Sequence, residues 1–111
     1  MATLQQRIAV RNNEAFNDVV SLAMLYIANE VISEDPSTVG YTQRYQYAKR
    51  IMTNVDQYRE TVKGFLVLND TVVDAAIAAG WPPANQTLEN QFLNALLDAI
   101  RASWNILSGT L

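Results

Sequence analysis

Residues 14–33, EAFNDVVSLAMLYIANEVIS, decide the fold of this chain. Apolar side chains recur in this segment three and four residues apart, which is the spacing of one face of an α-helix. They are Phe16, Val19, Val20, Ala23, Met24, Ile27, Ala28 and Val31. A second apolar flank makes the stripe wider than one neighbouring helix can cover, and consists of Leu22, Leu25, Tyr26 and Ile32. The pattern predicts a helix that is central in a bundle or faces a second subunit.

The segments on either side carry helix start and stop signals. Thr3 followed by Gln6 has the spacing of a capping box, which predicts a short helix over about residues 4–10. Asn12 and Asn13 then separate this helix from the long one. The segment SEDPS at 33–37 ends the long helix, because proline disfavours the helical conformation in the residue before it.

Helical spacing resumes after a loop and continues to the last residues. It predicts a third helix over about 41–53, a turn and cap at 54–56, and a fourth segment of about ten residues, with a short strand over 65–68 as the alternative for its end. Asp70 marks the cap of a two-turn helix that Gly80 stops, and a last helix runs from near Thr87 to Gly109. The expected fold is all-α, a compact bundle of five or six helices in a single domain, residues 1–111.

The composition excludes most catalytic chemistries. Among 111 residues there is neither histidine nor cysteine, which removes imidazole bases, thiolate nucleophiles, disulfides and the ordinary zinc and haem sites. The four glycines are isolated and fit the punctuation of helices, so the sequence offers no phosphate-binding loop. We therefore expect a protein that is not an enzyme and that holds no cofactor or metal.

Glu30 and Glu34 are the carboxylates best placed for chemistry. They lie four residues apart on one helix face, a spacing that suits a divalent cation or an acid–base pair. No third ligand is identifiable in the sequence, so solvation on an exposed face is the favoured interpretation.

Neither an export signal nor a membrane span is predicted. The first seven residues are mostly polar where a secretory signal needs an apolar run. The longest apolar stretch, residues 22–28, is much shorter than the roughly 20 residues that span a bilayer. We expect a soluble protein without a membrane partner.

Charge is unevenly divided along the chain. Residues 1–40 and 64–111 are net acidic, whereas residues 41–63 are net basic and interleave basic with aromatic side chains. We expect this basic strip to pair with an acidic flank of a neighbouring copy. Nucleic acid is the alternative partner, since such strips hold phosphates and stack bases, but the overall net charge of -3 disfavours it. The candidate interface residues are Glu30, Glu34, Tyr41, Arg44, Tyr47, Lys49, Arg50, Arg59 and Lys63.

Charged residues are also scarce. They make up 17% of the chain, against roughly 25% in an average globular protein. A sparsely charged surface suits packing against other protein copies, with a neutral-surfaced monomer as the alternative.

Four segments together resemble small virion-associated proteins of tailed bacteriophages. They are SEDPS at 33–37, Arg44, YAKRI at 47–51 and SWNILSG at 103–109. In such proteins a helix ends in a Glu-Asp-Pro segment, an aromatic-Ala-Lys-Arg run follows, and an aromatic-Asn pair lies near a closing glycine. The match covers about half of the chain. Gly40 and Tyr41 stand where an Asn-His pair is expected, which leaves the role of this loop open.

The resemblance implies a structural virion protein with no catalytic residues to transfer. Small helical phage proteins of this length are often head-to-tail connector or neck subunits, arranged as a ring beneath the portal. The expected partners are copies of the chain itself and portal, capsid or tail proteins. The expected location is the virion, and the host cytoplasm during assembly. A capsid decoration protein and a small nucleic-acid-binding regulatory protein are the alternatives.

Overall fold

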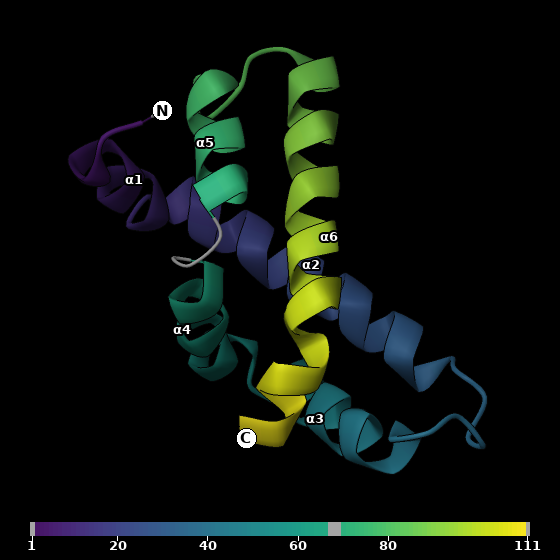
Figure 1. Ribbon diagram of the computed structural model, residues 1–111. Helices are drawn as coiled ribbons and strands as arrows, with labels where there is room; N and C mark the ends of the chain where they lie inside the picture. Colours follow the sequence, from purple (N-terminus) through teal and green to yellow (C-terminus); the bar gives the residue numbers. More distant parts are fainter. Residues whose placement is uncertain (1, 67–69, 111) are drawn as a thin grey trace.

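The computed structural model describes residues 2–66 and 70–110, which form six α-helices and, within these ranges, no strand. The helices are α1 (Leu4–Arg11), α2 (Glu14–Ile32), α3 (Tyr41–Thr53), α4 (Val55–Leu66), α5 (Asp70–Ala78) and α6 (Gln86–Thr110) (Figure 1). The predicted all-α bundle of five or six helices is confirmed.

Side-chain caps fix the starts of the first two helices. The Thr3 hydroxyl accepts from the Gln6 N–H, and the Gln6 amide oxygen accepts from the Thr3 N–H, so the predicted capping box is confirmed. Asn13 caps α2 by accepting from the N–H groups of Ala15 and Phe16. The same Asn13 oxygen accepts from Trp81 Nε1 at 3.2 Å, which ties the α5–α6 connection to the start of α2.

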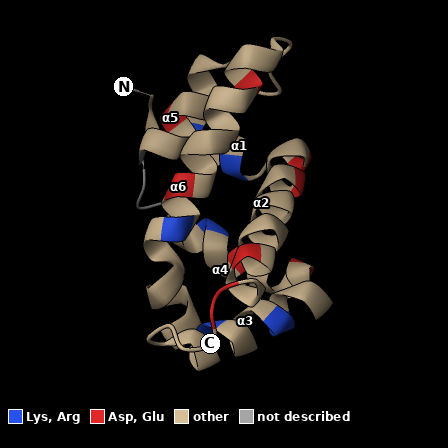
Figure 2. Ribbon diagram, turned by 90° about the vertical axis from the view of Figure 1, so that its right-hand side faces the viewer, with Lys and Arg blue, Asp and Glu red and all other residues tan. Residues whose placement is uncertain are grey.

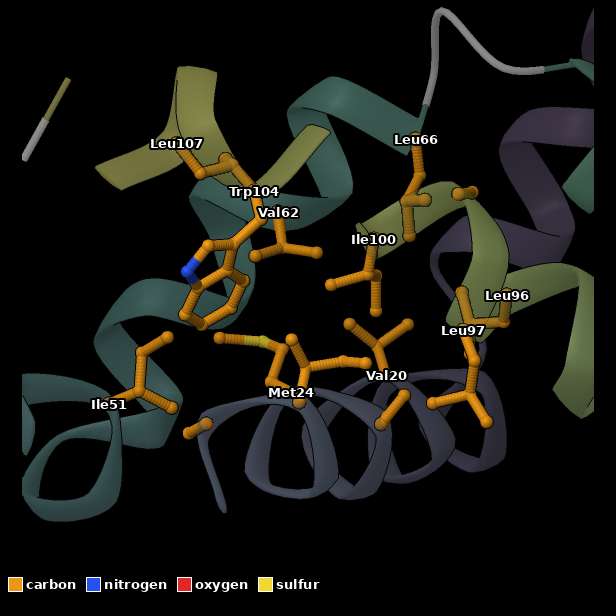
Figure 3. Close-up of a cluster of buried hydrophobic side chains, with 14 of the residues drawn as sticks. Val20, Met24, Ile51, Val62, Leu66, Leu96, Leu97, Ile100, Trp104 and Leu107 are labelled. Carbon is orange, nitrogen blue, oxygen red and sulfur yellow. The ribbon is translucent and has the colours of Figure 1, made fainter. Parts of the chain in front are cut away.

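The core lies where α2 and α6 meet, with α3, α4 and α5 packed around them. Figure 3 shows Val20 and Met24 of α2 facing Ile100 and Trp104 of α6. Two aromatic clusters extend this core toward its ends. One joins Phe16, Trp81 and Phe92, and the other joins Tyr47, Tyr58 and Trp104.

Helix α2 is central, as one of the two sequence interpretations has it. Of its predicted apolar face, all members are buried except Val19, which is half-buried. On the second flank, Leu25 and Ile32 are half-buried, whereas Leu22 and Tyr26 remain 65% and 57% exposed. The bundle therefore covers the inner face of α2 and leaves part of its outer face in water.

Length and composition alone would also allow α2 to cross a membrane. The sequence prediction considered only the unbroken apolar run at 22–28, whereas the helix as a whole passes this test. The core helix of a soluble protein passes it too. Here α2 packs against α3, α4 and α6.

Two local predictions differ from the structure. The turn expected at 54–56 is confined to Asn54, and Val55 and Asp56 already belong to α4. Asn54 suffices because its extended φ of -142° breaks the helix at a single residue. The alternative strand at 65–68 is wrong for Phe65 and Leu66, which are helical, and its other two residues lie outside the described ranges.

Only two of the four glycines punctuate helices. Gly40 and Gly80 have φ of +77° and +68°, the left-handed region that glycine adopts without strain. Gly64 lies within α4 and Gly109 within α6, so the last helix continues through the predicted stop to Thr110. Neither of these two has a positive φ.

Candidate subunit interface

The structure pairs Arg44 of the predicted basic strip with Glu34 of its own chain. Arg44 Nη2 lies 2.7 Å from Glu34 Oε2, and Arg44 Nη1 donates to the Val39 carbonyl at 2.8 Å. The Arg44 side chain is only 14% exposed. Gly40 leaves room for it, because a Cβ at Gly40 would lie 3.0 Å from Arg44 Nη1. This arginine holds the end of α2, the loop and α3 together.

Glu30 pairs with Arg101 of α6. Two hydrogen bonds join the guanidinium to the carboxylate, at 2.8 and 3.2 Å. The hydrogen bond from Arg101 holds the pKa of Glu30 below its ordinary value. Glu30 and Glu34 therefore face different arginines, and residues 2–66 and 70–110 contain no cluster of three or more potential metal ligands.

Two further cations of the strip have partners on their own helix. Arg59 lies 3.1 Å from Asp56 and also donates to the Ser21 hydroxyl of α2 at 3.2 Å. Lys63 Nζ lies 3.4 Å from Glu60. Lys49 and Arg50 are exposed. The strip thus serves partly to hold helices in place.

The tyrosines of the strip have different positions. Tyr47 is buried and contacts the rings of Tyr58 and Trp104, so the prediction that it belongs to a surface strip requires correction. Helical spacing places Tyr47 next to Ala48 and Ile51 on the inner face of α3. Tyr41 is half-buried, and its ring centroid lies 5.5 Å from that of Tyr45 in a tilted arrangement. Its hydroxyl donates a long hydrogen bond of 3.5 Å to the Ile32 carbonyl.

A polar pocket of about 320 Å³ lies between α2, α3 and α6. Both ion pairs described above line it, so its positive and negative charges face one another. Its lining residues are Ile27, Glu30, Val31, Glu34, Arg44, Arg101, Trp104 and Asn105.

An apolar groove of about 430 Å³ lies between α2 and α6. Its exposed walls include Leu22 and Tyr26, while Ala23 and Phe92 are buried at its base. Glu89 is its one charged lining residue among those that the structure describes. We name it the α2–α6 groove. Its lining residues are Val19, Leu22, Ala23, Tyr26, Trp81, Glu89, Phe92, Leu93, Asn94 and Leu97.

None of the interface residues predicted from the sequence lines this groove. The second apolar flank of α2 was the signal for one wall, since it contains Leu22 and Tyr26. The other wall comes from Leu93 and Leu97 of α6, which the sequence alone does not place beside them.

Charged residues are scattered along the helices, with uncharged stretches between them (Figure 2). Comparison of the chain with family models, with curated proteins and with solved structures finds no match.

Proposed function

We propose that this chain is a structural subunit of a tailed-bacteriophage virion, of the head-to-tail connector type, that assembles with copies of itself into a ring beneath the portal. The resemblance at 33–37, 44, 47–51 and 103–109 supplies the class of protein. The α2–α6 groove is the observation that carries the assembly part of the proposal.

An apolar groove with exposed walls favours a protein partner. Single exposed apolar residues are common on monomers, but contiguous apolar patches mark interaction surfaces. In the groove, Leu22 and Tyr26 lie one helical turn apart beside a hollow lined by further apolar residues of α6. Covering them would remove apolar surface from water without burying an unpaired charge from α2.

The charged residues support a secondary role in assembly. Arg44, Arg59 and Lys63 have intramolecular partners, so they contribute less to a neighbouring copy than the sequence pattern suggests. Lys49 is exposed near the end of α3 and can meet an acidic flank of the next copy. Such pairs set register more than affinity.

Sedimentation velocity over a range of protein concentrations tests self-association. We expect a defined oligomer with a closed ring mass. A chain that stays monomeric at all concentrations, and that never copurifies with heads or tails, would refute the proposal.

Counting copies per native particle separates the connector from its nearest alternative. A connector forms one ring and is present in few copies, whereas a capsid decoration protein covers the head in many. A high copy number spread over the head would replace the connector assignment by that of a decoration protein.

A further inference from the structure

Helix α1 presents an apolar face that its own chain does not cover. Leu4 and Ile8 lie one turn apart and are 62% and 42% exposed. Arg7 and Val10 lie on the opposite face, half-buried where α1 packs against α5 and α2. We name the exposed face, which consists of Leu4, Gln5, Ile8 and Ala9, the α1 ridge.

The α1 ridge and the α2–α6 groove are separate surfaces of one molecule. No residue of α1 is among the described residues that line the groove. Figure 1 shows α1 at the edge of the molecule, and α5 packs against both α1 and α6. Because α1 is packed against α5 and α2 and contributes no residue to the groove, the two surfaces can meet only between different copies.

Charge around the two surfaces is complementary. Helix α1 contains no acidic residue, and Arg11 lies one turn after Ile8 of the ridge. Glu89 lines the groove, and exposed Asp18 lies four residues before Leu22, on the same face of α2. An apolar ridge with Arg11 at its end and no acidic residue therefore matches an apolar groove with an acidic edge.

We infer that the α1 ridge of one copy docks into the α2–α6 groove of the next, with Leu4 and Ile8 against the walls formed by Leu22 and Tyr26. This inference rests on the proposed ring and names its contact. Because the two surfaces differ, the contact is heterologous and runs head to tail, which is the type of contact that closes a ring.

Complementation between two blocked variants tests the inference. Ile8→Glu places a charge on the ridge, and Leu22→Glu places one on the groove wall. Both positions are exposed, so each variant should keep the helical circular dichroism of the parent. Each should raise the concentration needed for assembly by about tenfold or more. Val39→Glu, at an exposed loop position away from both surfaces, is the matched control and should assemble as the parent does.

An equimolar mixture of the two variants supplies the decisive measurement. The Leu22→Glu copy retains an intact ridge, and the Ile8→Glu copy retains an intact groove. One ridge-to-groove contact can therefore form between them. Sedimentation should therefore show a one-to-one dimer in the mixture and monomer in each variant alone. A contact in which the same surface meets itself would give no such rescue.

The outcomes separate this inference from the ring itself. If the parent assembles but the mixture stays monomeric, or if Ile8→Glu assembles normally, the ridge-to-groove contact is overturned while the ring stands. If the parent never assembles, both fall.

Discussion

Helix α2 borders two hollows of opposite character. In the polar pocket, Glu30 and Glu34 meet Arg101 and Arg44, so its charges have partners within the chain. In the α2–α6 groove, Leu22 and Tyr26 face water. The charges of the polar pocket therefore hold the chain's own helices together, whereas the apolar side chains of the groove stay exposed.

The largest expected effect concerns the base of the groove. Phe92 is buried and contacts the rings of Phe16 and Trp81, at 5.8 and 4.8 Å between centroids. Phe92→Ala should lower the free energy of unfolding by about 3–5 kcal/mol, because it removes apolar contacts and leaves a cavity. Urea denaturation followed by circular dichroism measures the loss. A loss below about 1 kcal/mol would show that the groove is not built on this cluster.

The next effect concerns the better buried ion pair of the polar pocket. Arg44→Ala should cost about 1–2 kcal/mol, because it removes charge-assisted hydrogen bonds to Glu34 and Val39. Arg101→Ala should cost less, since that pair is 42% exposed on both sides and is screened by water. Chemical denaturation of both variants checks the order. Equal losses would contradict the view that burial distinguishes the two pairs.

Tyr47, which contacts Trp104 behind the polar pocket, should make stability fall at high pH. Burial raises the pKa of Tyr47 to about 12, and the charge of neighbouring Tyr58 adds to this. The contribution is fully present below pH 10, where an unfolded tyrosine is neutral, and is lost as the pH rises toward about 12. Tyr47→Phe should remove about 1 kcal/mol of this loss at pH 11.

The same substitution should be harmless at pH 7, because the Tyr47 hydroxyl has no hydrogen-bond partner among the described residues. Denaturant midpoints at pH 7 and 11 measure both effects, with the exposed Tyr26→Phe as control. A parent and a Tyr47→Phe variant with the same pH dependence would refute the prediction.

The smallest effect is the acid response of the exposed pair. The hydrogen bond from Arg101 lowers the pKa of Glu30 from its ordinary 4.5. Stability from this pair is therefore present above that value and is lost as the pH falls through the lowered pKa. Glu30→Gln should cost about 0.5 kcal/mol or less at pH 7, and this difference should shrink at an acidic pH below the ordinary value of 4.5. In an Arg101→Ala background the substitution should have little effect at either pH.

Helix positions were largely predictable from sequence because each helix has a local signal. The capping box at Thr3, the apolar spacing of 14–33 and the left-handed Gly80 are all short-range features. Gly109 shows the limit of such signals. A glycine that ends a helix commonly has a left-handed backbone, whereas Gly109 has no positive φ and lies within α6.

The candidate interface was less predictable because it depends on contacts between distant segments. Glu30 and Arg101 are 71 residues apart, and neither local sequence indicates that the two residues pair. The same holds for the groove, whose walls come from α2 and α6. Sequence pattern identifies an apolar surplus on α2, but only the crossing of the helices determines which part of it stays exposed.

Gly40 restricts the position of Arg44, which lines the polar pocket. Any other residue would strain the left-handed backbone there, and its Cβ would press on the guanidinium of Arg44. Asparagine tolerates that backbone best after glycine, so it would reduce the backbone strain. Its Cβ would still contact the guanidinium of Arg44. A solvent-facing loop position is thus restricted by its backbone conformation, and any larger residue there also requires the end of the Arg44 side chain to move by a few tenths of an ångström.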